Sequence, residues 1–243
     1  RKSFENLQTD YIDYYLLHSI GGGGINAFNA RYVDNGMLDF LMEERKAGRI
    51  RNLGFSFHGN QESFDAFMEL HEKYHWDFVQ IQLNYVDWKH AGGRNANAEY
   101  LQAELDKRGI QSVIMEPLVG GRLSEVPQFI ADRLEERSPE GSVASWAFRF
   151  AGTHEGVLCV LSGMTYLEHL QENCRTFSPL RPINAEEDAM LMRLADAICD
   201  LKAIPCTGCN YCMPCPYGID IPAVFGFYNN SIAEDLLPEG DST

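Results

Sequence analysis

Four cysteines near the end of the sequence are spaced three residues apart, at Cys206, Cys209, Cys212 and Cys215. Closely spaced thiols in a chain without an export signal indicate metal or redox chemistry more often than packing. Zinc sites usually pair one C-x2-C unit with a second, distant one, whereas C-x2-C-x2-C followed shortly by Cys-Pro is typical of iron-sulfur ligation. We therefore predict a 4Fe-4S cluster here, with zinc or free structural thiols as the alternatives.

The identity of the fourth ligand stays open at this point. In the usual iron-sulfur run the last gap is three residues and the last cysteine serves a second cluster, whereas here that gap is two and a single run is present. Cys215 therefore need not be the fourth ligand. The substitutes are Cys199, Cys174 and Cys159, each of which would otherwise be an ordinary small buried residue.

Composition and charge restrict the class of protein. The 243 residues are enough for one substantial core and a small appendage, and 45% hydrophobic with 23% charged residues is typical of a globular chain. A formal net charge of -15 argues against a nucleic-acid partner, because phosphates would be repelled. No apolar run approaches the roughly 18 residues of a membrane helix. The seven cysteines without an export signal predict a cytoplasmic location.

The elements that would position reactive groups alternate between strand and helix. Apolar runs predict five strands, at 11–18, 51–56, 78–84, 111–116 and 157–162. Helical periodicity follows at 34–47, 61–74, 97–107, 126–136, in a helix capped by Gly141 and Ser142, and at 165–177. A last helix is expected at 185–201 with Asn184 as its cap, and the stretches 21–34 and 85–98 are expected to be loops.

This alternation, without a hairpin signal, predicts a parallel α/β sheet that is either doubly wound or closed into a (β/α)8 TIM barrel. No G-x-G-x-x-G sequence follows a strand, which disfavours the doubly wound dinucleotide fold and leaves the barrel as our prediction. An eight-stranded barrel takes about 250 residues, so roughly 80 to 120 residues are expected upstream of Arg1. We expect residues 1–182 to belong to the barrel and residues 183–243 to form a helix and the cysteine segment.

Residues that act on a ligand in such a barrel lie at the carboxyl ends of the strands. Those ends carry polar residues here, namely His18, Ser56, His58, Asn84, Glu116 and Ser162. The third strand alternates, with Gln80, Gln82 and Asn84 on one face. In a half-exposed strand these amides would face water, but in a sheet covered on both faces they need a partner such as a ligand.

Several motifs together resemble the aldo/keto reductase family, in the bacterial group with a C-terminal ferredoxin-like iron-sulfur segment. They are TDYIDYYLLH at 9–18, GRIRNLGFS at 48–56, VQ at 79–80, MEPLVGG at 115–121, and LSGM at 161–164 with EN at 172–173. The resemblance covers nearly all of the chain. It implies a barrel of which β/α units four to eight are present, and a nicotinamide cofactor bound in extended form without a Rossmann motif.

The resemblance also implies roles for individual residues. His18 matches the histidine that orients the substrate carbonyl, while Ser56 and Gln80 match residues that hydrogen-bond the nicotinamide carboxamide. Positions along the pyrophosphate are matched by Leu118 and Gly121, and positions at the adenine by Glu172 and Asn173. The implied activity moves hydride between NAD(P)H and a small carbonyl or alcohol substrate, and an acidic protein of this kind is also expected to dock a redox partner protein.

Some positions depart from the family pattern. The catalytic tyrosine, aspartate and lysine belong to units two and three, so this chain by itself is expected to lack the general acid. Met115 and Phe57 replace an aromatic residue and an asparagine at the nicotinamide, and Gly163 and His169 replace basic residues at the 2'-phosphate. The choice between NAD and NADP therefore stays open. The alternatives are an electron-transfer or scaffold protein without hydride transfer, and a reductase whose cysteine segment binds a structural zinc ion.

Overall fold

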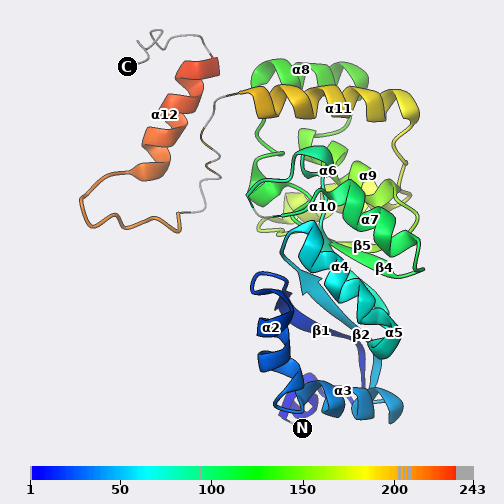
Figure 1. Cartoon of the computed structure of the whole chain (residues 1–243). Helices are drawn as coiled ribbons and strands as arrows, with labels where there is room; N and C mark the ends of the chain where they lie inside the picture. Colours follow the sequence, from blue (N-terminus) through cyan, green and yellow to red (C-terminus); the bar gives the residue numbers. More distant parts are fainter. Residues whose placement is uncertain (1, 94, 202–203, 205, 207–209, 234–243) are drawn as a thin grey trace. The chain divides into compact units, whose positions relative to one another are not determined.

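The computed structural model describes residues 2–93, 95–201, 204, 206 and 210–233 (Figure 1). The chain divides into two compact units. Unit 1 comprises Arg1–Leu83, Asp87–Met115 and His154–Gly163, and unit 2 comprises Asn84–Val86, Glu116–Thr153 and Met164–Thr243. Among the described residues, no helix is both long and apolar enough to cross a membrane. The predicted division at residue 182 stays a prediction.

Unit 1 is built on a five-stranded sheet in the order β1-β2-β3-β4-β5. Its strands are β1 (Ile12–Ile20), β2 (Ile50–Phe57), β3 (Phe78–Gln82), β4 (Gln111–Met115) and β5 (Val157–Val160). Every pairing in it is parallel. The predicted α/β class with a parallel sheet is confirmed, and the strands begin and end within two residues of their predicted positions.

The helices of unit 1 lie before and between its strands in sequence. They are α1 (Lys2–Leu7), α2 (Gly24–Phe28), the π-helix η1 (Asn29–Val33), α3 (Met37–Lys46), α4 (Gln61–Glu69), α5 (His71–Tyr74), α6 (Asp87–His90) and α7 (Ala98–Asp106). Helix α3 contacts β2, and α7 contacts β3 and β4. The core beside β2 is aromatic, since the ring of Phe55 lies 5.2 Å from that of Trp76 and 6.0 Å from that of Phe67.

Three predictions about unit 1 are wrong in detail. The stretch 21–34, predicted as a loop, contains α2 and η1, because Phe28 and Tyr32 are buried and the ring of Phe28 packs 5.3 Å from Phe67. The predicted helix 61–74 divides into α4 and α5. The predicted loop 85–98 contains the short helix α6. For α2 and η1, tertiary packing outweighs the local loop signal.

Unit 2 is helical. It contains the 3-10 helix η2 (Val119–Gly121), α8 (Gln128–Arg137), α9 (Val143–Thr153), α10 (Leu167–Phe177), α11 (Ala185–Asp200) and α12 (Ile221–Ala233), the last of which was not predicted. Helix α9 contacts both α8 and α10, and its residues Trp146 and Ala147 are fully buried. The predicted cap of α11 is confirmed, because the Asn184 side chain accepts hydrogen bonds from the backbone N–H groups of Glu186 and Glu187.

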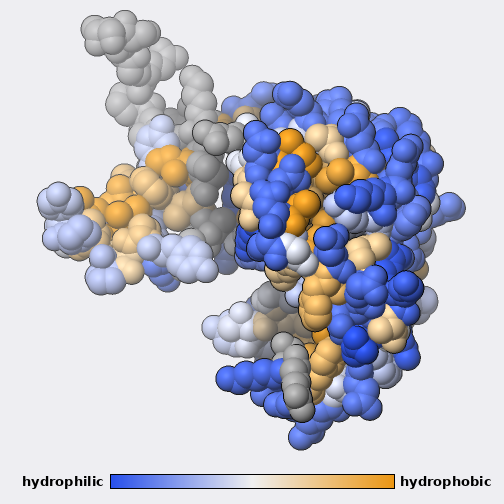
Figure 2. Space-filling view, turned by 60° about the horizontal axis from the view of Figure 1, so that its bottom comes forward, coloured by the Kyte–Doolittle hydropathy of each residue, from blue (hydrophilic) through white to orange (hydrophobic). Residues whose placement is uncertain are grey.

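Apolar side chains are exposed in both units. Strands β1 and β5 are the two edges of the described sheet, and β1 exposes Tyr14. In unit 2, α10 buries no residue and exposes Leu167 and Leu170. Figure 2 shows hydrophobic side chains gathered in patches among the hydrophilic ones on the face that it presents. Patches of this kind are typical of surfaces that another protein segment covers.

Candidate functional site

The carboxyl end of β2 and the middle of β3 place two predicted ligand residues next to each other. The parallel register pairs Ser56 with Gln80, so both side chains project from the same face of the sheet. Ser56 is buried and Gln80 is half-buried. A hydroxyl group and a carboxamide therefore lie side by side toward the end of the sheet that serves as the ligand-binding end in parallel α/β folds.

Strand β1 meets Ser56 through an irregularity in its pairing. Leu17 pairs with Phe55 and Ile20 with Phe57, so His18 and Ser19 together lie opposite Ser56. Ser19 has a φ of 57°, and its backbone N–H donates to the Ser56 hydroxyl oxygen over 2.8 Å. This bond fixes the Ser56 oxygen and leaves the hydroxyl proton for another acceptor.

His18 precedes that contact. Its side chain is exposed, and its backbone carbonyl accepts a hydrogen bond from the Tyr32 hydroxyl over 3.0 Å. Since Ser19 binds Ser56 directly, the backbone that carries His18 is held beside the Ser56 and Gln80 pair. An imidazole in this position is free to meet a ligand from the solvent side.

The Gln80 carboxamide has a weak partner inside the protein. Its Nε2 lies 3.3 Å from the sulfur of Met115 on the neighbouring strand β4. A thioether is a poor acceptor, so a stronger acceptor from a ligand would replace it at little cost. Gln82, two residues along, differs because its Nε2 donates to Asp87 over 2.7 Å. The structure thus favours the interpretation that the amides of β3 face a covered layer rather than water. Of Gln80 and Gln82, Gln80 has the weaker hydrogen-bond partner.

The loop that follows β4 belongs to unit 2 and is held by its own polar groups. Asn84 is fully buried and donates to the backbone carbonyl of Glu116 over 3.0 Å. The Glu116 carboxylate in turn accepts from the backbone N–H of Gly120 at 2.5 Å. Leu118 and Gly121 form a turn closed by a 3.0 Å backbone bond, and Gly121 has a φ of 106°, which favours glycine.

Glu172 and Asn173 lie on α10, also in unit 2, and both are half-buried. On the same helix, the Nδ1 of His169 accepts from the backbone N–H of Thr165 over 3.3 Å. The structure therefore brings His18, Ser56 and Gln80 together within unit 1. The joining of that group with the residues of unit 2 in one site stays a prediction.

Comparison with known proteins identifies the family. Residues 1–195 match the model of the Aldo/keto reductase family. The chain belongs to this family. No curated protein sequence matches it.

Solved aldo/keto reductase structures share the fold. The holo form of one from Bacillus halodurans aligns with a TM-score of 0.60 at 22% identity, over 79% of this chain and 64% of that chain. One from Brucella melitensis aligns with a TM-score of 0.56 at 18% identity, over 79% of this chain and 64% of that chain. A thermostable aldo-keto reductase in complex with the inhibitor epalrestat aligns with a TM-score of 0.59 at 21% identity, over 79% of this chain and 63% of that chain. The chain thus spans less than two thirds of the length of these aldo/keto reductases.

The cysteine segment is described in part. Cys206 and Cys215 are half-buried free thiols, Cys212 is an exposed one, and Cys209 lies outside the described residues. Within the described ranges, no three potential metal ligands come together. The predicted ligand set is therefore still a prediction. Cys159, Cys174 and Cys199 are exposed, so the interpretation of these three as ordinary buried residues is wrong.

Two contacts in this member of the Aldo/keto reductase family were missed by reasoning from the sequence. Ser19 anchors Ser56 through an irregularity that only the pairing of β1 with β2 reveals. Asn84 and Glu116 were expected at strand ends as ligand residues, but Asn84 acts on the backbone of Glu116 and so holds the loop. Near them, burial raises the pKa of Tyr85, so this phenol stays protonated. No periodicity in the sequence signals these contacts, because they join residues 37 and 32 positions apart or depend on burial.

Proposed function

We propose that this protein is an NAD(P)H-dependent oxidoreductase that interconverts a carbonyl and an alcohol, in which this chain supplies β/α units four to eight of a (β/α)8 barrel. The observation that carries the proposal is the adjacent pair of Ser56 on β2 and Gln80 on β3. Family membership supports the reaction class. In this proposal residues 1–182 belong to the barrel, and residues 183–243 form a helix and a cysteine segment in a cytoplasmic protein.

The donor and acceptor groups of this pair fit a nicotinamide carboxamide. That group has one carbonyl acceptor and one NH2 donor, and the Ser56 hydroxyl proton and the Gln80 amide can satisfy both. Ser56 is already oriented by the N–H of Ser19, and Gln80 would give up only its weak hydrogen bond to the sulfur of Met115. When bound, the nicotinamide supplies the hydride, while the protein orients the ring against the substrate.

The remaining roles follow from position. The exposed imidazole of His18 would orient the substrate carbonyl oxygen by a hydrogen bond. The turn at Leu118 and Gly121 would lie along the pyrophosphate, since an added Cβ at Gly121 meets no atom within 4 Å and the backbone is open to approach. Glu172 and Asn173 on α10 would bind the adenine.

This chain by itself does not supply the general acid that would protonate the carbonyl oxygen. The family tyrosine, with its aspartate and lysine, has no counterpart in this sequence, so we propose that turnover requires further β/α units and that this chain alone is inactive. The open edges at β1 and β5 support this proposal, because a closed barrel has no edges.

A second candidate function rests on Phe57. This residue replaces an asparagine of the family, is buried, and packs its ring 4.9 Å from that of Phe64, so it belongs to the core rather than to a ligand site. This loss favours an electron-transfer or scaffold protein that docks a redox partner through a 4Fe-4S cluster at Cys206, Cys209, Cys212 and Cys215. Thiolates suit iron-sulfur ligation or zinc, although no three potential ligands come together among the described residues.

Titration of the full-length protein with NADH, followed by fluorescence, tests the first function. Gln80→Leu should weaken binding about tenfold, because it removes a carboxamide hydrogen bond to the ligand. Gln128→Leu is the matched control, since Gln128 is an exposed residue of α8 that bonds only Asp132. Absence of NADH binding by the unaltered protein would refute hydride transfer. Analysis of iron, zinc and sulfide after anaerobic purification separates a cluster, with about four irons and four sulfides per chain, from a zinc site.

A further inference from the structure

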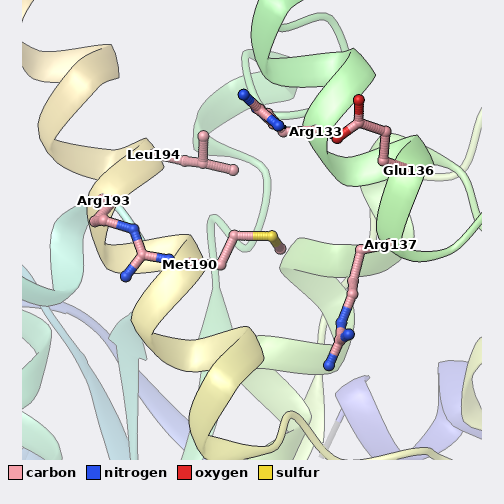
Figure 3. Close-up of a pocket in the computed structure, with 6 residues that line it drawn as sticks. All are labelled: Arg133, Glu136, Arg137, Met190, Arg193 and Leu194. Carbon is pink, nitrogen blue, oxygen red and sulfur yellow. Dashed lines mark hydrogen bonds and ion pairs between the residues drawn. The ribbon is translucent and has the colours of Figure 1, made fainter.

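Helices α8 and α11 of unit 2 line an open cavity that the proposed reductase site does not use. Its volume is about 470 Å³. The lining residues are Arg133, Glu136 and Arg137 of α8, with Met190, Arg193 and Leu194 of α11 (Figure 3). Cavities of roughly 300 to 1,000 Å³ are typical of small-molecule sites.

Three arginines line this cavity in a chain whose formal net charge is -15. Arg133 and Arg137 are four residues apart and so lie on one face of α8, while Arg193 comes from α11. Figure 3 shows the Met190 side chain between Arg193 on one side and Arg137 on the other. A concentration of cations in an acidic protein, from both walls of one cavity, indicates an anion as its occupant.

The charges of the cavity are only partly balanced by the protein. Arg133 pairs with Glu136 over 3.1 Å, but both side chains are more than 60% exposed, at 68% and 66%. Arg137 pairs with Glu186 over 2.9 Å, again at an exposed position. Within the described ranges, Arg193 forms no ion pair. Exposed pairs are worth about 0 to 1 kcal/mol, so a ligand anion can exchange with these carboxylates at little cost.

The floor of the cavity is apolar. Leu194 is 9% exposed, and Met190 lies one turn before it on α11. A bare inorganic ion would leave this surface in contact with water, whereas a short aliphatic chain would cover it. Arginine binds carboxylates through two parallel hydrogen bonds, which suits an acidic group at each wall.

We propose that the cavity between α8 and α11 binds a small aliphatic dicarboxylate, with one carboxylate on Arg193 and the other on Arg133, and with its carbon chain over Leu194, which lies between these two arginines in Figure 3. This site lies within unit 2 and is independent of the proposed nicotinamide site, so the two can fail separately. Glu136 acts against binding, because its carboxylate competes for Arg133.

Calorimetric titration of the full-length protein with succinate tests this proposal. Arg193→Gln should weaken binding about tenfold, because a charged hydrogen bond is lost. Arg133→Gln should weaken it by a similar factor, and both residues are exposed, so neither change is expected to unfold the protein. Glu136→Gln should tighten binding roughly threefold, because a competing negative charge is removed. Arg175→Gln is the matched control, since Arg175 is an exposed arginine of α10 outside the cavity.

Two further ligands make the result specific. Dimethyl succinate, which carries no charge, should not bind, and inorganic phosphate should bind more weakly than succinate. Equal binding of phosphate and succinate would overturn the assignment to dicarboxylates. Absence of a heat signal with succinate at millimolar concentration would overturn the site itself, as would equal affinities of the Arg193→Gln and Arg175→Gln proteins.

Discussion

Replacing Glu187 by alanine should destabilise unit 2 more than any exposed charge substitution. The Glu187 side chain is 3% exposed and accepts hydrogen bonds from Arg149 over 2.7 Å and from Arg181 over 2.8 Å. Its Oε2 also accepts from the backbone N–H of Asn184 over 3.1 Å, which completes the capping box of α11. One carboxylate therefore joins α9, the segment before α11 and the first turn of α11.

The size of the effect follows from what the substitution leaves behind. Arg149 is 8% exposed and would lose its only carboxylate, and an uncompensated buried charge costs about 3 to 5 kcal/mol. Arg149 keeps the backbone carbonyl of Arg181 as an acceptor at 2.9 Å, so we expect the lower end of this range. For a chain of this size, about 2 to 4 °C of melting temperature corresponds to each kcal/mol, which predicts a decrease of about 6 to 12 °C.

The pH dependence should change with the same substitution. Burial alone would raise the pKa of Glu187, but the Asn184 N–H, the hydrogen bond from Arg149 and the charges of Arg149 and Arg181 lower that pKa overall. A carboxyl group with a lowered pKa stabilises the folded state above its unfolded pKa and loses that contribution as the pH falls through its folded pKa. The difference in stability between the unaltered protein and Glu187→Ala should therefore shrink on acidification.

Thermal and urea unfolding, followed by circular dichroism, measure both effects. Glu186→Gln is the control, because Glu186 is the preceding residue, is 84% exposed and pairs with an exposed arginine. Its free energy of unfolding should change by less than about 1 kcal/mol. Adding Arg149→Met to Glu187→Ala should restore part of the lost stability, since the buried charge is then removed. Equal melting temperatures for Glu187→Ala and Glu186→Gln would refute this reasoning.

Three further substitutions test the candidate site and its sheet. Ser56→Ala should cost about 1 to 3 kcal/mol of stability, because the Ser19 N–H loses its acceptor, and should also weaken NADH binding; a loss of binding without a stability change would contradict the anchoring role. Gly54→Ala should cost more than about 2 kcal/mol in urea unfolding, because the added Cβ would lie 2.2 Å from the Phe78 carbonyl oxygen, and an unchanged midpoint would be evidence against the close approach of β2 and β3. Glu116→Gln should tighten NADH binding roughly fivefold in a fluorescence titration, because a negative charge leaves the turn proposed for the pyrophosphate; equal or weaker binding would exclude that position for the pyrophosphate.

The sequence by itself determined the α/β class and most of the element positions. Period-two and period-3.6 patterns of apolar residues depend on neighbours along the chain, so they predicted all five strands and the cap at Asn184. The motifs at 9–18 and 48–56 were enough to predict the family that the match over residues 1–195 confirms. The sequence placed Ser56 at the end of one strand and Gln80 on one face of the next, but it did not show that the two residues pair.

The tertiary structure decided the contacts that join distant residues. The bond from Ser19 to Ser56 depends on an extra residue in β1, and the contact of Glu187 with Arg149 spans 38 positions. The cavity of α8 and α11 exists because these helices meet within unit 2, although each reads in sequence as an ordinary charged helix. Local patterns report which face of an element is apolar, whereas the partner of each polar group depends on register and packing between elements.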